Sequence, residues 1–495
     1  MISAFANTMK VPELRSRILF TLAMIVIVRL GVHLPLPGVD VQALNDYLAK
    51  TAQEGGDNPW GALGAILTIF SGGGLQQCGI FALGIMPYIS ASIMTQLMGA
   101  VIPSWQKMLQ EEGGRQKMTK YTRILAIIIA VVQGYLLTTS LRNPSSIGLT
   151  GLGDLVMNPG FIFTATTIFI IVTGTMFLMW IGDQITERGV GNGISLIISV
   201  NIIHALPGAF SIAWKTCVMT GDGMEINPLG SLKMVALILF MILVVALVVT
   251  ITQAQRRIPV QQAKRMIGRG KVMNGGTQYL PLKLNYSGVM PVIFATAILA
   301  LPTLLVRQIF SADSPVVTVV TVLMSPSDIG YYIISAIMIF FFSYFWVATM
   351  FRPQQIAEDM KRSGSYIPGV RPGPPTATFL DQTMSRLTFS GSLFLTLIYF
   401  LPSLLSVWGS LPMLVTQFFG GTSLLILVGV LLDMMRQIEA TLLQKNYDGF
   451  MKKGRIRGKY SHLQGTGAAA EGKGIVILWV IIALFVLAGA IVMAS

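Results

Sequence analysis

The stretch FIFTATTIFIIVTGTMFLMWIGDQITERGVGNGISLIISVNIIHALPGAFSIA, residues 161–213, decides the fold class of this chain. It holds two apolar runs, 161–181 and 192–213. Each run is long enough to cross a bilayer as a helix, which takes roughly 17–25 residues. The acidic and basic side chains of the stretch lie in the short turn between the runs. The pattern predicts two membrane helices that cross in opposite directions.

Nine further apolar runs predict membrane helices on either side of this pair. They cover 18–34, 80–102, 121–141, 231–254, 288–310, 329–350, 387–408, 413–435 and 474–494. The composition agrees, because 53% of the 495 residues are hydrophobic and only 11% are charged, whereas soluble domains carry about 25% charged residues. We predict an all-α polytopic membrane protein with a ten-helix body. We also predict an eleventh membrane helix, 474–494, after a polar linker, 461–473.

The basic residues predict the orientation in the membrane. If the N-terminus is cytoplasmic, 29 of the 35 Lys and Arg residues lie in cytoplasmic segments, as the positive-inside rule requires. The net charge of +14 therefore belongs mostly to cytoplasmic loops. The C-terminus lies outside if 474–494 spans the membrane.

The number of helices predicts an internal symmetry. Five helices followed by five more arrive in opposite orientation, because five is odd. This arithmetic predicts two inverted halves, residues 1–215 and 216–460, around a site near the membrane midplane. Both a small-solute transporter and a channel fit such an architecture.

The polar residues argue against the transporter and against an enzyme. Ion-coupled transporters usually carry an ionisable residue deep in the bundle, and Arg29 is near enough to the outer end of its span to snorkel. Two cysteines and three widely separated histidines predict neither a disulfide framework nor a metal site. No convergent His, Asp or Ser set is evident, and GAAAEGKG (467–474) lacks the Ser or Thr of a phosphate-binding loop. We predict no enzymatic activity and no cofactor, with a small-solute secondary transporter as the alternative function.

Two cytoplasmic segments are longer than topology requires. Segment 255–287 has seven basic residues and no acid, and segment 351–386 is long and mixed in charge. Such loops set topology and attract anionic lipids, and they equally suit the docking of a cytosolic partner such as a ribosome, whose RNA is anionic. Charge alone leaves both interpretations open.

The segment Trp60–Gln77, WGALGAILTIFSGGGLQQ, is short and rich in glycine for a membrane span. It ends near Gly72, Gly73 and Gly74, which reach backbone conformations that other residues resist. It is either a re-entrant or interfacial turn, or a short helix that folds into a cavity from the outer side and is hinged at the glycines.

Several long strings resemble the SecY family of protein-conducting channels. They are IFALGIMPYISASIMTQL (80–97), VTGTMFLMWIGDQITERGVGNGISLII (172–198), LPLKLNYSGVMPVIFA (280–295), SGSYIPGVRPGPPTATFLD (363–381) and FFGGTSLLILVGVLLDMM (418–435). The resemblance runs in order from about Arg15 to Tyr460. It implies two five-helix halves around an hourglass channel that conducts unfolded polypeptide outward and opens sideways to lipid.

The resemblance implies roles for named residues. An apolar constriction would be lined by Ile85, Ile89, Ile198, Ile202, Ile293 and Ile426. A plug over about 63–78 would close the outer funnel and would include Leu67, Phe70, Gly72, Gly73 and Gly74. A lateral gate would include Ser90, Gln96, Thr296 and Leu301.

The resemblance also implies partners and a location. The partners are SecE-like and SecG-like subunits, the SecA motor, the ribosome, signal-bearing preproteins and anionic lipids. Partner contacts would involve Arg371, together with Arg269 and Lys271, which flank a glycine where family members often have consecutive arginines. The location is the bacterial inner membrane. The extra helix 474–494 departs from the family pattern, as a lipid-anchored appendage or as a helix packed where an accessory subunit would otherwise sit.

Overall fold

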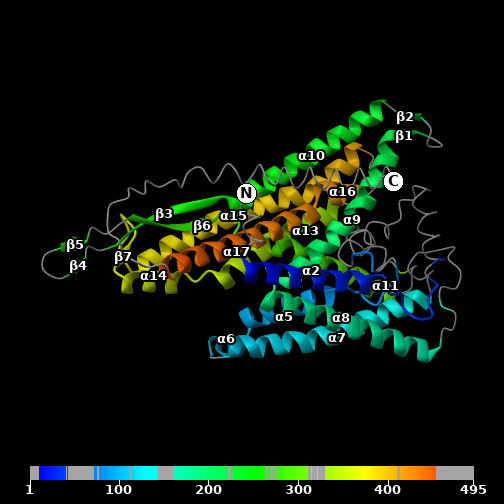
Figure 1. Ribbon diagram of the computed structural model, residues 1–495, viewed down its shortest axis with the longest axis horizontal. Coiled ribbons are helices and arrows are strands. Elements are labelled where there is room, and N and C mark those ends of the chain that lie inside the picture. Colours follow the sequence, from blue (N-terminus) through cyan, green and yellow to red (C-terminus); the bar gives the residue numbers. More distant parts are fainter. Residues whose placement is uncertain are drawn as a thin grey trace.

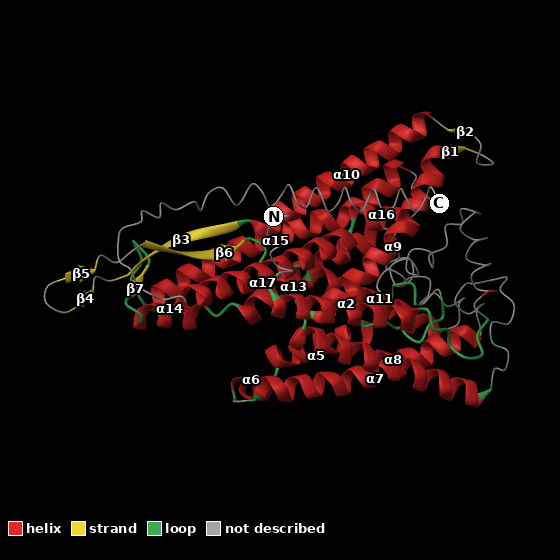
Figure 2. Cartoon of the chain, in the orientation of Figure 1, coloured by secondary structure: helices red, strands yellow, loops and turns green. Residues whose placement is uncertain are grey.

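The architecture is a bundle of long helices with short strands at its two ends. The computed structural model describes residues 11–40, 42, 72–74, 77–111, 113–142, 156, 160–220, 225–226, 228–262, 265–267, 271–273, 277–309, 314, 320, 329–409 and 413–452. Figure 1 shows the helices lying side by side, and Figure 2 shows β3, β6 and β7 beside α14 at one end of the bundle and β1 and β2 at the other. The predicted linker 461–473 and the predicted helix 474–494 lie outside the described residues.

Each of the first ten predicted spans coincides with a helix or a helix pair. These are α2 (Pro12–Val32), α5 (Met86–Val101), α7 (Gly114–Arg142), α8 (Phe161–Arg188), α9 (Gly193–Val218), α10 (Pro228–Gln253), α11 (Met290–Ile309), α13 (Ile329–Met350), α15 (Pro374–Gly409), and α16 (Met413–Gly420) with α17 (Thr422–Lys452). The all-α, multi-pass prediction is confirmed.

Six stretches of the described chain are long and apolar enough to cross a membrane by themselves. They are Gln116–Arg142, Phe161–Arg188, Gly193–Cys217, Leu232–Gln253, Gly330–Arg362 and Pro374–Leu401. The helix α10 shows why a bilayer must surround the bundle. Its inward residues Met234, Leu237 and Met241 are buried, but Leu239 and Leu243 on another face are about 60% exposed. A helix that is apolar on all sides needs lipid on the side that protein does not cover.

The second predicted span begins later than expected. Residues 80–85 form turns, and helix α5 begins at Met86. Gly84 has a φ of +55°, and Pro87 fits the start of a helix because it lacks an N–H group. Hydrophobicity therefore extends over turns as well as over the helix that follows.

The N-terminal and C-terminal helices occupy different sides of the bundle. The blue-to-cyan helices α2, α5, α7 and α8 lie on one side in Figure 1, and the yellow-to-orange helices α15, α16 and α17 lie on the other. Helix α9 joins them, because it packs on α8 and also on α10, α16 and α17. Helix α5 contacts α11 across the opposite junction.

The basic segment 255–287 folds as a β-hairpin, which the sequence reading left unassigned. Strands β3 (Gln255–Gln262) and β6 (Thr277–Lys283) pair antiparallel, and β4 (Arg265–Ile267) pairs with β5 (Lys271–Met273) nearer the tip. Ile258 and Val260 of β3 are buried in a cluster with residues of α13 and α15. Alternating burial along β3 is the pattern of a strand with one face on a core.

The other strands and helices are short connections. Strand β7 (Ser365–Tyr366) adds to β3, which gives the sheet order β6-β3-β7. The helix α14 (Pro353–Arg362) precedes β7, and α6 (Pro103–Gln110) connects α5 to α7. Strands β1 (Met219–Thr220) and β2 (Glu225–Ile226) connect α9 to α10 at the far end of the bundle. The predicted boundary between the two halves, at 215/216, lies in the last turn of α9, just before this junction. The division into two halves stays a prediction.

Candidate functional site

The six isoleucines predicted to form a constriction are all buried in the described bundle. Their exposed fractions range from 0% to 7%, and all six belong to one contiguous apolar cluster. Four helices contribute them: α5 has Ile85 at its N-cap and Ile89 in its first turn, α9 has Ile198 and Ile202, α11 has Ile293 and α17 has Ile426. The six isoleucines are thus an aliphatic part of the bundle's main apolar core (the aliphatic centre), and this core also contains aromatic side chains such as Phe294 and Phe418. Their role as a ring around a pore stays a prediction.

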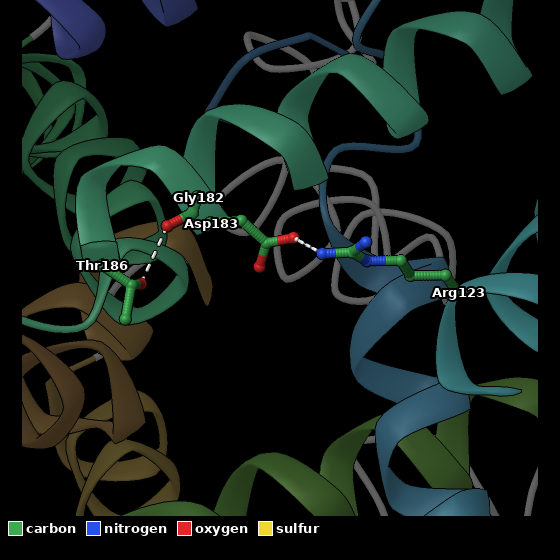
Figure 3. Close-up of polar contacts among 4 residues, drawn as sticks. All are labelled: Arg123, Gly182, Asp183 and Thr186. Atoms are coloured by element: carbon green, nitrogen blue, oxygen red, sulfur yellow. Dashed lines mark hydrogen bonds and ion pairs between the residues drawn. The ribbon is translucent and has the colours of Figure 1, made fainter. Parts of the chain in front are cut away.

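The helix that carries Ile198 and Ile202 is fixed by close packing at its N-terminal end. A Cβ added to Gly193 would lie 2.0 Å from the Gly182 carbonyl oxygen of α8. The Gly193 N–H also donates to Thr186 Oγ1 at 2.9 Å. Thr186 itself donates to the Gly182 carbonyl at 2.8 Å, as Figure 3 shows. The start of α9 is therefore locked to the end of α8.

Substitution of Gly193 by alanine is expected to destabilise the protein by about 1–3 kcal/mol, because backbone must move to admit the methyl group. The measurement is the thermal unfolding midpoint of the purified protein in detergent. Gly208 on the same helix is the control, since a Cβ there would meet nothing within 4 Å. Alanine at 208 should leave the midpoint unchanged or raise it, because alanine is the better helix former. Equal midpoints for the two variants would contradict the packing argument.

The turn between α8 and α9 also connects the two sides of the bundle. The Val190 N–H donates to Thr21 Oγ1 of α2 at 3.1 Å, and the Gly191 N–H donates to Gln437 Oε1 of α17 at 2.9 Å. Gly191 has a φ of +85°, which only glycine adopts readily. This turn lies in one of the strings that carry the family resemblance, and its backbone donors explain why it is rich in glycine.

An ion pair fixes the neighbouring helix. Arg123 of α7 and Asp183 of α8 lie 2.5 Å apart, between nitrogen and oxygen (Figure 3). Both side chains are partly exposed, so the pair has only a modest effect on stability. The sequence predicted a turn after residue 181, but α8 continues to Arg188 and the turn begins at Gly189, so Asp183 lies within the helix.

The predicted lateral gate lies where α5 meets α11. Ser90 is 6% exposed, and Gln96 donates to Ser92 Oγ at 3.0 Å within the same helix. Thr296 is half-buried and donates to the Ile293 carbonyl at 2.9 Å. Leu301 falls in α11, but its side chain is outside the described part. The two helices are in contact, and the role of their polar residues as a gate stays a prediction.

Most of the predicted plug, including Leu67 and Phe70, lies outside the described residues. The glycine turn Gly72–Gly74 is described. Gly72 has a φ of +65° and Gly73 a φ of +87°, and these left-handed conformations favour glycine. The turn is joined to the following segment, because the Gln77 N–H donates to the Gly73 carbonyl at 3.1 Å. The Leu36 N–H donates to the Cys78 carbonyl at 2.8 Å. The predicted hinge is therefore attached to the rest of the bundle at its far end.

Arg29 was missed as a functional candidate. It does not snorkel outward as expected, because its guanidinium donates hydrogen bonds to Gly72 and to α9. His204 of α9 lies against the same turn, at 3.6 Å from a Cβ built on Gly73. The signal in the sequence was a charged residue inside a predicted span, which in membrane proteins usually marks function.

The two basic segments form one folded surface. Strand β7 of the segment 351–386 pairs with β3 of the segment 255–287, and Tyr366 donates its hydroxyl to Gln261 Oε1 at 3.0 Å. Arg371 is exposed beside this sheet, in a turn whose backbone is fixed by Thr376, which donates to the Arg371 carbonyl at 2.8 Å. Arg269 is outside the described residues, and Lys271 is described only by its backbone in β5. The predicted partner contacts stay predictions.

The fold and the site together define a multi-pass helical membrane protein with an aliphatic centre and a basic surface at one end. The sequence profile of the SecY family matches residues 79–435. A protein of Aquifex aeolicus described as protein translocase subunit SecY is 42% identical over 443 residues, which are 89% of this chain and 97% of that protein. Its counterpart in Chlamydia trachomatis is 38% identical over 92% of this chain and 100% of that protein. The chain belongs to the SecY family.

Solved structures agree on the fold. A structure described as a protein conducting channel matches with a TM-score of 0.57 and 17% identity, over 88% of this chain and 95% of that chain. Sec61 in the canine ribosome-channel complex matches with a TM-score of 0.53 and 16% identity over the same shares of the two chains. At these identities the likeness concerns the fold.

Proposed function

We propose that this chain forms the channel of a bacterial protein translocase, which passes unfolded secretory polypeptides across the inner membrane and releases membrane segments sideways into lipid. The observation that carries the proposal is that the six isoleucines, although far apart in sequence, are all buried in the main apolar core of the bundle. The relatives in Aquifex and Chlamydia are described as protein translocase subunits, which supports the same role here.

The aliphatic centre suits this function chemically. A ring of isoleucines excludes water and ions when it closes, because an apolar constriction dewets. It also offers no hydrogen bond or charge to a passing polypeptide, so that side chains of every kind can pass without being bound tightly. The protein acts as a channel, and the work of transport falls to a partner.

The contact between α5 and α11 is the proposed exit toward lipid. An apolar residue favours the membrane centre by about 0.3–0.6 kcal/mol, so a signal sequence of ten such residues gains several kcal/mol by moving there. This gain is available only when the two helices separate. The gate residues Ser90, Gln96, Thr296 and Leu301 lie along these helices.

The basic surface formed by β3, β6, β7 and the turn around Arg371 is the proposed docking site for the driving partner. The SecA motor or a translating ribosome would supply the force, and SecE-like and SecG-like subunits would complete the complex in a membrane that contains anionic lipids. The pairing of β3 with β7 supports this proposal, because one partner could contact both segments at once. The plug over 63–78 would seal the outer side. The extra helix 474–494 would place the C-terminus in the periplasm.

The test is protease protection of a signal-bearing preprotein in liposomes that contain this chain, a SecE-like subunit, SecA and ATP. We expect protected preprotein that depends on both ATP and the signal. A preprotein with a charged residue in its signal is the control and should stay accessible. The proposal would be contradicted if the protease digests the preprotein completely although the complexes are well assembled, both with SecA and with ribosome-bound chains.

A further inference from the structure

We propose that Arg29 is a positioning residue that holds the Gly72–Gly74 turn against α9 in the idle channel. The inference deepens the proposed function, on which it rests. Arg29 lies near the end of α2, 43 residues before Gly72 and more than 170 before its partners on α9. Its guanidinium therefore joins three parts of the chain that are far apart in sequence.

The contacts are specific to a forked donor. Arg29 Nη1 donates to the Gly72 carbonyl at 3.1 Å. Arg29 Nη2 donates to the Val200 carbonyl at 3.0 Å and to Asn201 Oδ1 at 2.7 Å. A guanidinium has several N–H groups in a rigid plane, which suits it to bind separate oxygens at once. A lysine ammonium is a single point and cannot reproduce this arrangement.

The glycine turn is shaped to fit under the guanidinium. A Cβ on Gly72 would lie 2.4 Å from Asn201 Oδ1 and 2.9 Å from Arg29 Nη2. Only glycine permits this approach. The positive φ of Gly72, +65°, also favours glycine at this position. Gly72 and Gly74 are buried. The close fit indicates that the turn, α2 and α9 pack specifically against one another.

The electrostatics explain why the contact can be released. No carboxylate of the described chain lies within 4 Å of Arg29, so the cation is held by carbonyl and amide dipoles alone. Its Nε is buried without a partner among the described residues. An unpaired buried N–H weakens the arrangement, and a charge without a counter-charge is held less firmly than an ion pair.

The position of the acceptors couples the turn to the constriction. Val200 and Asn201 lie between Ile198 and Ile202 in the sequence of α9, and Asn201 is 3% exposed. A movement of this turn of α9, as a polypeptide widens the constriction, therefore shifts two of the three oxygens that Arg29 binds. The Gly72–Gly74 turn then loses its attachment at the same moment.

The first readout is the reactivity of Cys78, which follows the turn and needs no transport. Burial raises the pKa of the Cys78 thiol to about 11. Because only the thiolate reacts, maleimide labelling at pH 8 is slow and rises as the pH approaches this value. Loosening the turn exposes the thiol and lowers its pKa toward the ordinary range, so labelling at pH 8 becomes faster. Cys217 is the other cysteine of the chain and is replaced by alanine in all samples.

The variants are Arg29→Gln, Arg29→Lys and Asn201→Ala, with Arg142→Gln as the matched control. Arg142 ends α7 and is exposed, so its substitution removes the same charge without touching the turn. We expect Arg29→Gln to raise the rate of Cys78 labelling at pH 8 by about 10-fold or more, because the substitution removes hydrogen bonds that a charged group donates. Arg29→Lys and Asn201→Ala should give smaller increases, and Arg142→Gln none. The resting ion current of reconstituted channels should rise in the same order.

Equal labelling and current in wild type, Arg29→Gln and Arg142→Gln would overturn the inference. Loss of assembly in Arg29→Gln, together with unchanged labelling in Asn201→Ala, would assign Arg29 to folding alone and would also overturn it. Failure of the wild-type protein in the protease-protection test would instead count against the proposed function. Cys78 labelling does not depend on transport, so it separates the two failures.

Discussion

Channels in which Ile85, Ile202 and Ile426 are all replaced by serine are expected to conduct ions at rest at least about 10-fold better than wild-type channels. Each of these side chains is at most 1% exposed, and they come from three different helices. Removing a buried isoleucine takes away about 1.5–3 kcal/mol of apolar transfer free energy. A fall of only about 1.4 kcal/mol in the barrier to ion passage raises the rate tenfold.

The measurement is the current through single reconstituted channels without preprotein or motor. The control is Ile171→Ser, because Ile171 is 0% exposed but belongs to a separate cluster with Leu36 and Leu141. This control loses the same kind of packing away from the predicted constriction. If Ile171→Ser leaks as much as the triple variant, loss of packing explains the current and the ring assignment is wrong. Wild-type current in a correctly assembled triple variant would also refute the ring.

Reversal of the charge at Arg371 is expected to slow motor-driven transport at least about 10-fold while it leaves the resting channel closed. Arg371 is exposed next to the sheet β6-β3-β7, and its side chain makes no hydrogen bond within the described chain. Arg371→Glu changes the charge by two at a surface that we propose binds the partner. Truncating one member of a hydrogen-bonded charge pair at an interface costs about 2–5 kcal/mol.

The measurement is the initial rate of preprotein protection with SecA and ATP, together with the SecA affinity at several salt concentrations. The matched control is Arg386→Glu, because Arg386 is also exposed and lies in the N-terminal half of α15. Equal rates in the two variants would exclude a specific role for Arg371. A rise in resting current in Arg371→Glu would show that the change disturbs the channel rather than the contact with the motor.

The sequence located the membrane helices well, because hydrophobic length is a local property. The predicted span 329–350 has the bounds of helix α13, and 161–181 begins where α8 begins. The errors fall where another force overrides hydrophobicity. Residues 80–85 are apolar but form turns, since Gly84 and Pro87 delay the helix. Helices α8 and α15 extend well beyond the apolar runs, because polar helix ends continue outside the lipid.

The contacts between distant segments could not be predicted. Strand β3 pairs with β7 about 100 residues later, and no local pattern in either segment predicts which strand it pairs with. Arg29 was noted as a charge inside a span, but its acceptors at Gly72 and on α9 became visible only in three dimensions. The six isoleucines came from the family resemblance, since isoleucine in a membrane helix is equally common in packing and against lipid.

The sheet β6-β3-β7 has a mechanical consequence. Strand β3 continues directly from α10, β6 leads into α11, and β7 lies between α14 and α15. A force that a docked protein applies to either loop is thus transmitted to α10, α11 and α15 together, through two strand ladders and a shared apolar core. Because the two loops are joined by strand pairing, they would move together rather than independently. If a partner docks on this sheet as proposed, a push there would reach α11, the helix that meets α5, without any ligand entering the membrane.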